Sequence, residues 1–292
     1  MQLLGFSLLC LIWGTTWLAI KFSLEGFPPF LGAGARFTLA ALAVGLFLGF
    51  KRRTFHIARR ETKVLILVAF LMYAVDYGLI YWGEQTLSPG VTAIFFAPFA
   101  LFTALWSLAF LKSERMTPIR WLGLFMGLAG ITAIFYDQLV ITHFDRRVTL
   151  SILAVITASA GGSLSNVLVK RHLDKMDAGL ITFYQMAFGI VFLYFIGLLV
   201  EDPSHIHVTP KVGAAVAYLG LVGSAFAFVL NFRLLKVMSP VTLSLIIYVT
   251  PLIALGIDFF FFGETLPLRS LAGMALIFGG IGFVQRRPRA SR

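Results

Sequence analysis

The chain has 292 residues, of which 59% are hydrophobic and 13% are charged, and its formal net charge is +11. A soluble domain carries about a quarter charged residues, so this composition excludes a soluble fold and predicts an integral membrane protein. The basic residues flank apolar runs and form no nucleic-acid-binding motif. We therefore expect the lipid bilayer, and not a nucleic acid, to be the surrounding partner.

Ten apolar runs are long enough to cross a bilayer, which takes about 20 helical residues. The first run is too long for a signal peptide and should remain as a helix. The predicted fold class is therefore an all-α integral membrane protein with ten transmembrane helices. The ten runs cover residues 3–22, 30–50, 64–83, 88–111, 119–136, 148–169, 178–200, 211–232, 240–262 and 267–285.

Lysine and arginine lie mainly on one side of the predicted bundle. With ten spans, both termini share that side with the basic connections near residues 51–63, 112–120 and 170–175. The other side has only Lys21, Arg146, Arg147, Lys211 and Arg269. Because cytoplasmic loops are rich in lysine and arginine, this asymmetry predicts a multi-pass protein of the inner (cytoplasmic) membrane with both termini in the cytoplasm.

The two halves of the sequence repeat each other with an offset of about 150 residues. Lys21, for example, falls on Lys170. Each half holds five spans, and because five is odd, the second copy must enter the membrane from the opposite side. The sequence thus predicts two inverted five-helix repeats, residues 1–142 and 143–292. Secondary transporters commonly use this architecture with the substrate site between the repeats; a duplicated structural protein is the alternative.

Several short motifs lie at characteristic places along the two halves. They are Trp13-Gly14-Thr15-Thr16-Trp17, Arg36-Phe37, Lys112-Ser113-Glu114-Arg115, Tyr184-Gln185 and Phe262-Gly263-Glu264-Thr265. In their order and spacing the chain resembles the ten-helix EamA-type branch of the drug/metabolite transporter superfamily. The resemblance implies export or exchange of small metabolites, notably amino acids, without a bound cofactor. One departure is Pro98, which lies three residues before the repeat partner of Pro251.

Charged side chains inside a span are costly in lipid and are therefore candidates for function. Only Arg36, Asp76 and Asp258 lie clearly within the predicted spans. Arg36 and Asp76 have opposite charges at similar depth on consecutive helices, which predicts a buried ion pair. That pair could be a strut between helices or a gate that couples transport to protons. Asp258 lies nearer the outer surface and can reach water.

Aromatic and polar residues on the apolar spans suggest a cavity wall. Tyr73, Tyr77 and Tyr81 follow one another at intervals of four on one helix face. Phenol hydroxyls facing lipid lack partners, so we predict that Tyr77 and Tyr81 line a cavity; simple packing is the alternative. Trp17 and Asn166 occupy repeat-related positions, and the amide of Asn166 needs polar partners. A hydrogen bond between helices would also satisfy it.

Pro98 and Pro251 lie close to the centres of spans 4 and 9. Each removes a helical hydrogen bond and frees a carbonyl group, so we assign them a gating role, with a fixed bend as the alternative. Phe95, Phe99 and Tyr248 neighbour these prolines and should offer aromatic surface to the substrate. We expect spans 1, 3, 4, 6, 8 and 9 to line the cavity and the glycine-spaced spans 5 and 10 to brace it.

The sequence contains no phosphate-binding glycine loop, zinc-ligand spacing or Ser-His-Asp arrangement. We therefore expect no metal, no cofactor and no enzymatic activity. The glycines of spans 5 and 10 predict close packing within a monomer, with a homodimer contact as the alternative.

Together these features predict a secondary transporter that exports or exchanges a small-molecule substrate by alternating access. Amino acids, including aromatic ones, fit a cavity that is aromatic and polar yet nearly free of charge. The alternative within the class is a proton-coupled exporter of hydrophobic cations, held by aromatic faces and Asp76. A channel and a non-transporting membrane scaffold are alternatives of other classes.

Overall fold

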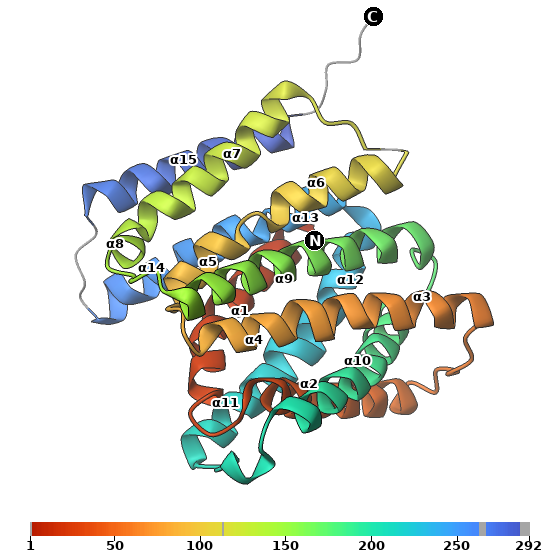
Figure 1. Cartoon of the computed structure of the whole chain (residues 1–292). Helices are drawn as coiled ribbons and strands as arrows, with labels where there is room; N and C mark the ends of the chain where they lie inside the picture. Colours follow the sequence, from red (N-terminus) through yellow and green to blue (C-terminus); the bar gives the residue numbers. More distant parts are fainter. Residues whose placement is uncertain (1, 113, 263–266, 287–292) are drawn as a thin grey trace, which may run out of the picture.

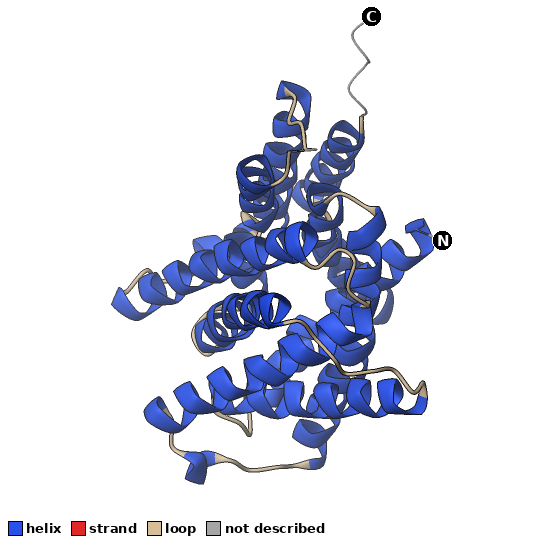
Figure 2. Ribbon diagram, turned by 90° about the vertical axis from the view of Figure 1, so that its right-hand side faces the viewer, coloured by secondary structure: helices blue, strands red, loops and turns tan. Residues whose placement is uncertain are grey.

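A computed structural model describes residues 2–112, 114–262 and 267–286, apart from the side chains of residues 254 and 257–262. Helices joined by short loops make up these segments, and no strand occurs among them (Figures 1 and 2). Eight of the described helical segments are long and apolar enough to span a membrane, and Pro118–Ile134 and Pro240–Ile253 are shorter apolar helices. These segments coincide with the ten predicted spans.

The first half follows the predicted order of five spans. Its elements are α1 (Gln2–Ser23), α2 (Pro29–Phe50), α3 (Arg59–Ala69), η1 (Phe70–Tyr77), α4 (Gly78–Glu84), α5 (Pro89–Phe96), α6 (Phe99–Phe110), α7 (Pro118–Ile134) and the short α8 (Tyr136–Val140). The third span is one continuous helix made of α3, η1 and α4, and the fourth span is divided into α5 and α6.

The second half repeats this pattern. Its elements are α9 (Arg146–His172), α10 (Ala178–Val200), η2 (Pro203–His205), α11 (Pro210–Gly220), η3 (Leu221–Phe226), α12 (Ala227–Val237), α13 (Pro240–Ser244), α14 (Ile246–Phe262) and α15 (Leu268–Gln285). The third span again contains a π-helical segment, η3, at the position that corresponds to η1. π-Helical turns are rare and often mark functional sites.

Local sequence signals set where the helices begin. Proline occupies the first turn of α2, α5, α7, α11 and α13, where its missing N–H group costs no hydrogen bond. Ser88, Thr209 and Ser239 precede three of these helices and accept hydrogen bonds from backbone N–H groups of the first turn. These caps satisfy donors that lipid could not satisfy.

The two halves are interleaved and pack symmetrically. Helix α1 packs against α11 and α12 of the other half, and α9 packs in the same way against α3, η1 and α4. Helix α2 pairs with its repeat partner α10, and α7 pairs with α15 (Figure 1). This exchange of equivalent contacts is the arrangement expected of inverted repeats.

The pair α7 and α15 forms a layer of its own at the edge of the molecule (Figure 1). A Cβ atom at Gly123 would lie 2.5 Å from the carbonyl oxygen of Gly280, and one at Gly130 would lie 2.6 Å from that of Gly273. Glycine is therefore required where these two backbones touch. The glycine faces are occupied within the chain, as the sequence predicts.

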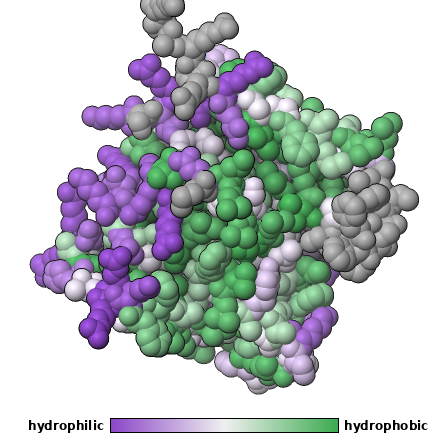
Figure 3. Space-filling model, turned by 180° about the vertical axis from the view of Figure 1, so that it is seen from behind, coloured by the Kyte–Doolittle hydropathy of each residue, from purple (hydrophilic) through white to green (hydrophobic). Residues whose placement is uncertain are grey.

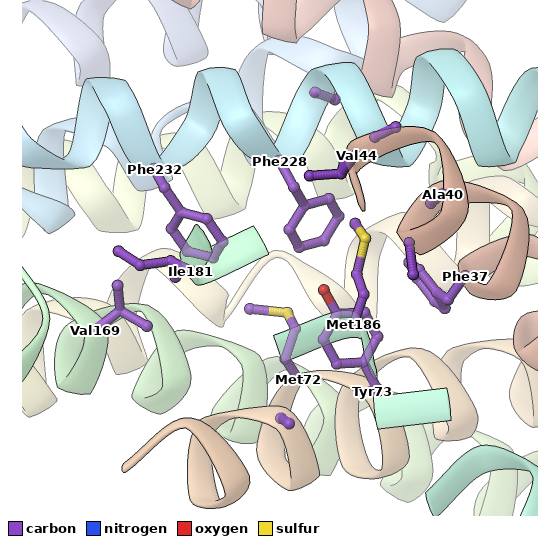
Figure 4. Packing of buried hydrophobic residues seen from close by; sticks show 14 of the residues in the cluster. Phe37, Ala40, Val44, Met72, Tyr73, Val169, Ile181, Met186, Phe228 and Phe232 are labelled. Atoms are coloured by element: carbon purple, nitrogen blue, oxygen red, sulfur yellow. The ribbon is translucent and has the colours of Figure 1, made fainter. Parts of the chain in front are cut away.

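Aromatic side chains from both halves fill the centre of the bundle. Phe37 meets Tyr73 edge-on at 4.5 Å between ring centroids, and Tyr73 stacks at 6.1 Å on Phe228 (Figure 4). Large apolar side chains such as Phe195 and Phe278 are exposed on the outside. Figure 3 shows hydrophobic residues covering the middle of one face and hydrophilic residues gathered at one side, which fits a bundle surrounded by lipid.

We call the end of the bundle that carries the α2–α3, α6–α7, α9–α10 and α12–α13 connections the basic end. The opposite end carries the α1–α2, α4–α5 and α10–α11 connections. There the two halves are tied together, because both carboxylate oxygens of Glu201 accept hydrogen bonds from the first turn of α2, at 2.8 Å from Phe30 N and 3.0 Å from Leu31 N. Burial raises the pKa of Glu201, although these two hydrogen bonds lower it.

Candidate functional site

A cavity lies between the two halves. It is lined by α1, η1 and α4, α5 and α6, α9, α12, and α13 and α14, which are the six spans that the sequence predicts. The volume open to the centres of water-sized molecules is about 90 Å³, whereas one water needs roughly 10–15 Å³ of such space. The cavity therefore holds several waters or a small molecule.

Aromatic and polar side chains share the cavity wall. The aromatic ones are Trp13, Trp17, Tyr77, Phe96, Phe99 and Phe228, and the polar ones are Thr16, Asp76, Thr103, Asn166, Asn231, Ser244 and Thr250. Of the predicted site residues, the structure thus brings Trp17, Asp76, Tyr77, Phe99 and Asn166 together around one space. Asp76 is the single charged side chain among the described lining residues.

Asp76 is carried by η1 and is only 4% exposed. Its carboxylate packs against Gly162 of α9, where a Cβ atom would collide with the carboxylate oxygen Oδ2. Oδ1 is buried and has no hydrogen-bond partner among the described residues. A buried carboxylate oxygen that lacks a partner is costly, so a donor placed beside it would stabilise the site.

Arg36 is buried behind the cavity wall, and the predicted ion pair with Asp76 is wrong. Its guanidinium donates to Ser224 Oγ at 2.8 Å, to the Gly223 carbonyl at 3.4 Å and to the Tyr81 hydroxyl at 3.5 Å. Within the described ranges it makes no salt bridge. The reason is direction: Arg36 reaches toward η3, while Asp76 faces α9.

Tyr77 separates Arg36 from the cavity. The Arg36 guanidinium lies 4.9 Å from the centroid of the Tyr77 ring and 5.0 Å from that of Phe37. Both distances are within the range of cation–π attraction. The Arg36 guanidinium therefore lies against the ring of Tyr77, which lines the cavity, but Arg36 itself does not line it.

Three predicted aromatic site residues lie away from the cavity. Tyr81 is fully buried with its hydroxyl at Arg36. Tyr248 is also fully buried, donates to the Leu124 carbonyl at 2.9 Å, and fills the space above Gly127 of α7. Phe95 packs against the hydrophobic cluster that contains Phe96 and Phe99, and Phe96 lines the cavity in its place.

The two prolines act differently from each other. Pro98 lies where the fourth span is interrupted between α5 and α6, whereas Pro251 lies inside the continuous helix α14. The carbonyl freed by Pro251 is that of Ile247, and it accepts the Thr250 hydroxyl at 3.2 Å. The carbonyl freed by Pro98 is that of Ile94, and it accepts a hydrogen bond from Ala97 N at 3.3 Å. Both freed carbonyls are thus satisfied within the protein.

Asn166 lines the cavity and carries a buried acceptor without a partner among the described residues. Its Oδ1 atom is buried without a partner in the described part of the chain, so the predicted alternative of a hydrogen bond between helices is not seen for that atom. Thr16 and Asn231 also line the cavity. Their alignment with Ser165 and Tyr81 in the repeat was the signal that could have identified them, because all four are polar residues on apolar spans.

Metal binding finds no support within residues 2–112, 114–262 and 267–286, where no group of three His, Cys, Asp or Glu side chains could hold an ion. The side chain of Asp258 lies outside the described residues. The chemistry of the cavity therefore consists of hydroxyl and amide groups, aromatic faces and one carboxylate.

Comparison with known proteins identifies the family. A model of the EamA-like transporter family matches residues 1–136 and 149–286. The chain belongs to this family. The protein is therefore a multi-pass membrane transporter and not an enzyme. The predicted fold class and the predicted resemblance to this family are confirmed.

Two similar proteins are named as transporters. The uncharacterized transporter YoaV of Bacillus subtilis is 25% identical, over 96% of this chain and 94% of that protein. The uncharacterized inner membrane transporter YedA of Escherichia coli is 28% identical, over 88% of this chain and 82% of its own. A crystal structure of a protein with 20% identity matches with a TM-score of 0.80 and covers 97% of this chain and 95% of that one, which shows a shared fold.

Proposed function

We propose that this EamA-like transporter exports or exchanges amino acids, including aromatic ones, by alternating access. The observation that carries the proposal is the pair of buried, opposite charges that do not neutralise each other. The Asp76 carboxylate lies on the cavity wall, and the Arg36 guanidinium lies behind Tyr77. A zwitterion in this space can place its ammonium group beside Asp76 and its carboxylate near Tyr77, on the other side of whose ring Arg36 lies, so no net charge is buried.

The remaining walls suit the other groups of an amino acid. The ammonium group can donate to Asp76 and to the free Asn166 Oδ1, which are both buried acceptors. An apolar or aromatic side chain can pack on Trp17 and Phe99. The small volume of the cavity favours a single amino acid over a peptide.

The alternative is a proton-coupled exporter of hydrophobic cations. The observation that favours it is the same Asp76 carboxylate surrounded by aromatic rings, which attract a cation that has lost its water. Such a ligand needs the acid and the aromatic faces but gains nothing from Arg36.

Counterflow of radiolabelled phenylalanine into proteoliposomes distinguishes the two. We expect unlabelled phenylalanine to compete, and phenethylamine, which lacks the carboxylate, to compete at least tenfold more weakly. Asp76→Asn should weaken phenylalanine binding, whereas Tyr248→Phe, a tyrosine away from the cavity, should not. Uptake of a quaternary phosphonium cation without any phenylalanine counterflow would establish the alternative.

We also propose that both termini face the cytoplasm and that the chain acts as a monomer. The basic end of the bundle supports the first proposal. The second is supported by the glycine faces of α7 and α15, which are used against each other within one chain. A protein mass of twice that of one chain, measured by light scattering in detergent, would overturn the proposal of a monomer.

A further inference from the structure

A lysine fastens one end of the second half. Lys170, in the last turn of α9, donates from Nζ to the Leu235 carbonyl at 2.7 Å and to the Lys236 carbonyl at 2.9 Å. These carbonyls belong to the last turn of α12, where the helix dipole attracts a cation. We call this contact the Lys170 latch. It joins the first and third spans of the second half at the basic end of the bundle.

The first half has the same lysine but not the same contact. Lys21 aligns with Lys170 in the repeat and lies in the last turn of α1. The chain positions that correspond to Leu235 and Lys236 are Gln85 and Thr86, just after α4, at the opposite end of the bundle. Within the described residues, Lys21 makes no hydrogen bond or salt bridge.

Glu84 adds a second, independent sign that something belongs at the end of α4. It is the last residue of α4 and only 6% exposed, and neither of its carboxylate oxygens has a partner in the part of the chain that the structure describes. Glu84 shares this end of the bundle with Lys21 and belongs to the same half as the buried Arg36, but it makes no salt bridge among the described residues. An uncompensated carboxylate is expensive at such a site, and Arg36 is already held by Ser224 and Gly223.

Inverted repeats give this asymmetry a meaning. Because the two halves are related by an axis in the membrane plane, exchanging their conformations moves the opening of the cavity from one membrane face to the other. In this structure the second half has its lysine docked, and the first half has not. The exchanged conformation should have the reverse.

We propose that Lys21 docks on the end of α4 in the other conformation of the transport cycle. There it pairs with the Glu84 carboxylate and the carbonyls of Gln85 and Thr86, while the Lys170 latch opens. The two lysines thus close opposite ends of the cavity in turn. This inference rests on the alternating access in the proposed function and not on the identity of the substrate.

Labelling of a cavity cysteine from each membrane face tests the two latches. The sole cysteine, the buried Cys10, is first replaced by alanine, and Thr16→Cys on the cavity wall serves as the reporter. A membrane-impermeant thiol reagent is then applied to right-side-out and inside-out vesicles. The ratio of the two labelling rates follows the populations of the two conformations.

We expect Glu84→Gln and Lys170→Met to shift this ratio in opposite directions, each by about fivefold, which corresponds to roughly 1 kcal/mol. Lys21→Met, at an exposed position, should reproduce Glu84→Gln and serves if that variant is poorly folded. Glu25→Gln, which breaks the exposed pair with Lys211 at the same end, is the matched control and should leave the ratio unchanged.

Two results would overturn the inference. One is a ratio that moves in the same direction for Lys21→Met and Lys170→Met, or that stays at the Glu25→Gln value. The other is labelling from one face only in every variant, which would also remove alternating access. A shift in opposite directions supports the latches even if amino acids fail to compete in counterflow, so the two proposals can fail separately.

Discussion

Arg36 should be coupled energetically to Ser224 and not to Asp76. The perturbations are Arg36→Met, Ser224→Ala and Asp76→Asn, combined in two double-mutant cycles that share the arginine variant. Both cycles remove the same cation–π contact with Tyr77, so that contribution cancels when the two coupling energies are compared.

The structure sets the expected magnitudes. Hydrogen bonds to charged groups contribute about 1.5–3 kcal/mol in soluble proteins, and polar contacts in membrane proteins average about 0.6 and reach about 1.7 kcal/mol. The Arg36–Ser224 contact is charged, buried and 2.8 Å long, so we expect a coupling energy of about 1–2 kcal/mol. For Arg36 and Asp76, which do not pair, we expect less than about 0.5 kcal/mol.

Reversible unfolding of the purified protein in mixed detergent micelles gives the free energies. All variants are measured at one pH and one detergent ratio, because both change the reference state. A coupling between Arg36 and Asp76 that equals or exceeds the coupling between Arg36 and Ser224 would refute the assignment and restore the ion pair that the sequence predicts.

Gly162→Ala should abolish counterflow at normal membrane yield, because the added Cβ collides with Asp76. Gly49→Ala, whose Cβ would meet nothing within 4 Å, is the control. Equal counterflow by the two variants would contradict the contact between Gly162 and Asp76. Tyr248→Phe should lower the free energy of unfolding by about 1 kcal/mol without changing substrate affinity, and a changed affinity would place Tyr248 in the site. Burial raises the pKa of Glu201 above the 4.5 usual for glutamate, so the folded state binds more protons and stability should fall as pH rises from that value. In thermal unfolding, Glu201→Gln should make stability less dependent on pH in this range. An unchanged pH dependence would count against this role of Glu201. A phosphatase reporter fused after Arg292 should be inactive and a fluorescent reporter bright, and the reverse would place the C-terminus outside.

The sequence alone determined the number of spans, their order, the repeat and the class of the protein. These features depend on the length and hydrophobicity of local segments, because a helix must satisfy its backbone within itself to cross lipid. The offset of about 150 residues between the halves then required an inverted arrangement, since five spans per half is odd. Even the six spans around the cavity could be predicted, because the glycine-spaced spans had another use.

Only the tertiary structure decided which side chains face the cavity. Depth along a helix can be read from the rise per residue, but rotation about its axis depends on neighbouring helices and on unbroken helical register. The π-helical segment η1 breaks that register, since each residue it adds turns the following side chains by about 100°. The tyrosine stripe is therefore divided: the Tyr77 ring lies between Arg36 and the cavity, while Tyr81, beyond the π-helical turn, also meets Arg36 but does not line the cavity.

The partner of Arg36 was beyond the sequence for the same reason. Opposite charges at equal depth predict attraction, but they do not show which faces of two helices meet. In the folded bundle, η3 of the other half supplies the Gly223 carbonyl and the Ser224 hydroxyl. Ser224 is separated from Arg36 by 188 residues along the chain. Contacts of that kind exist only once the two halves have interleaved.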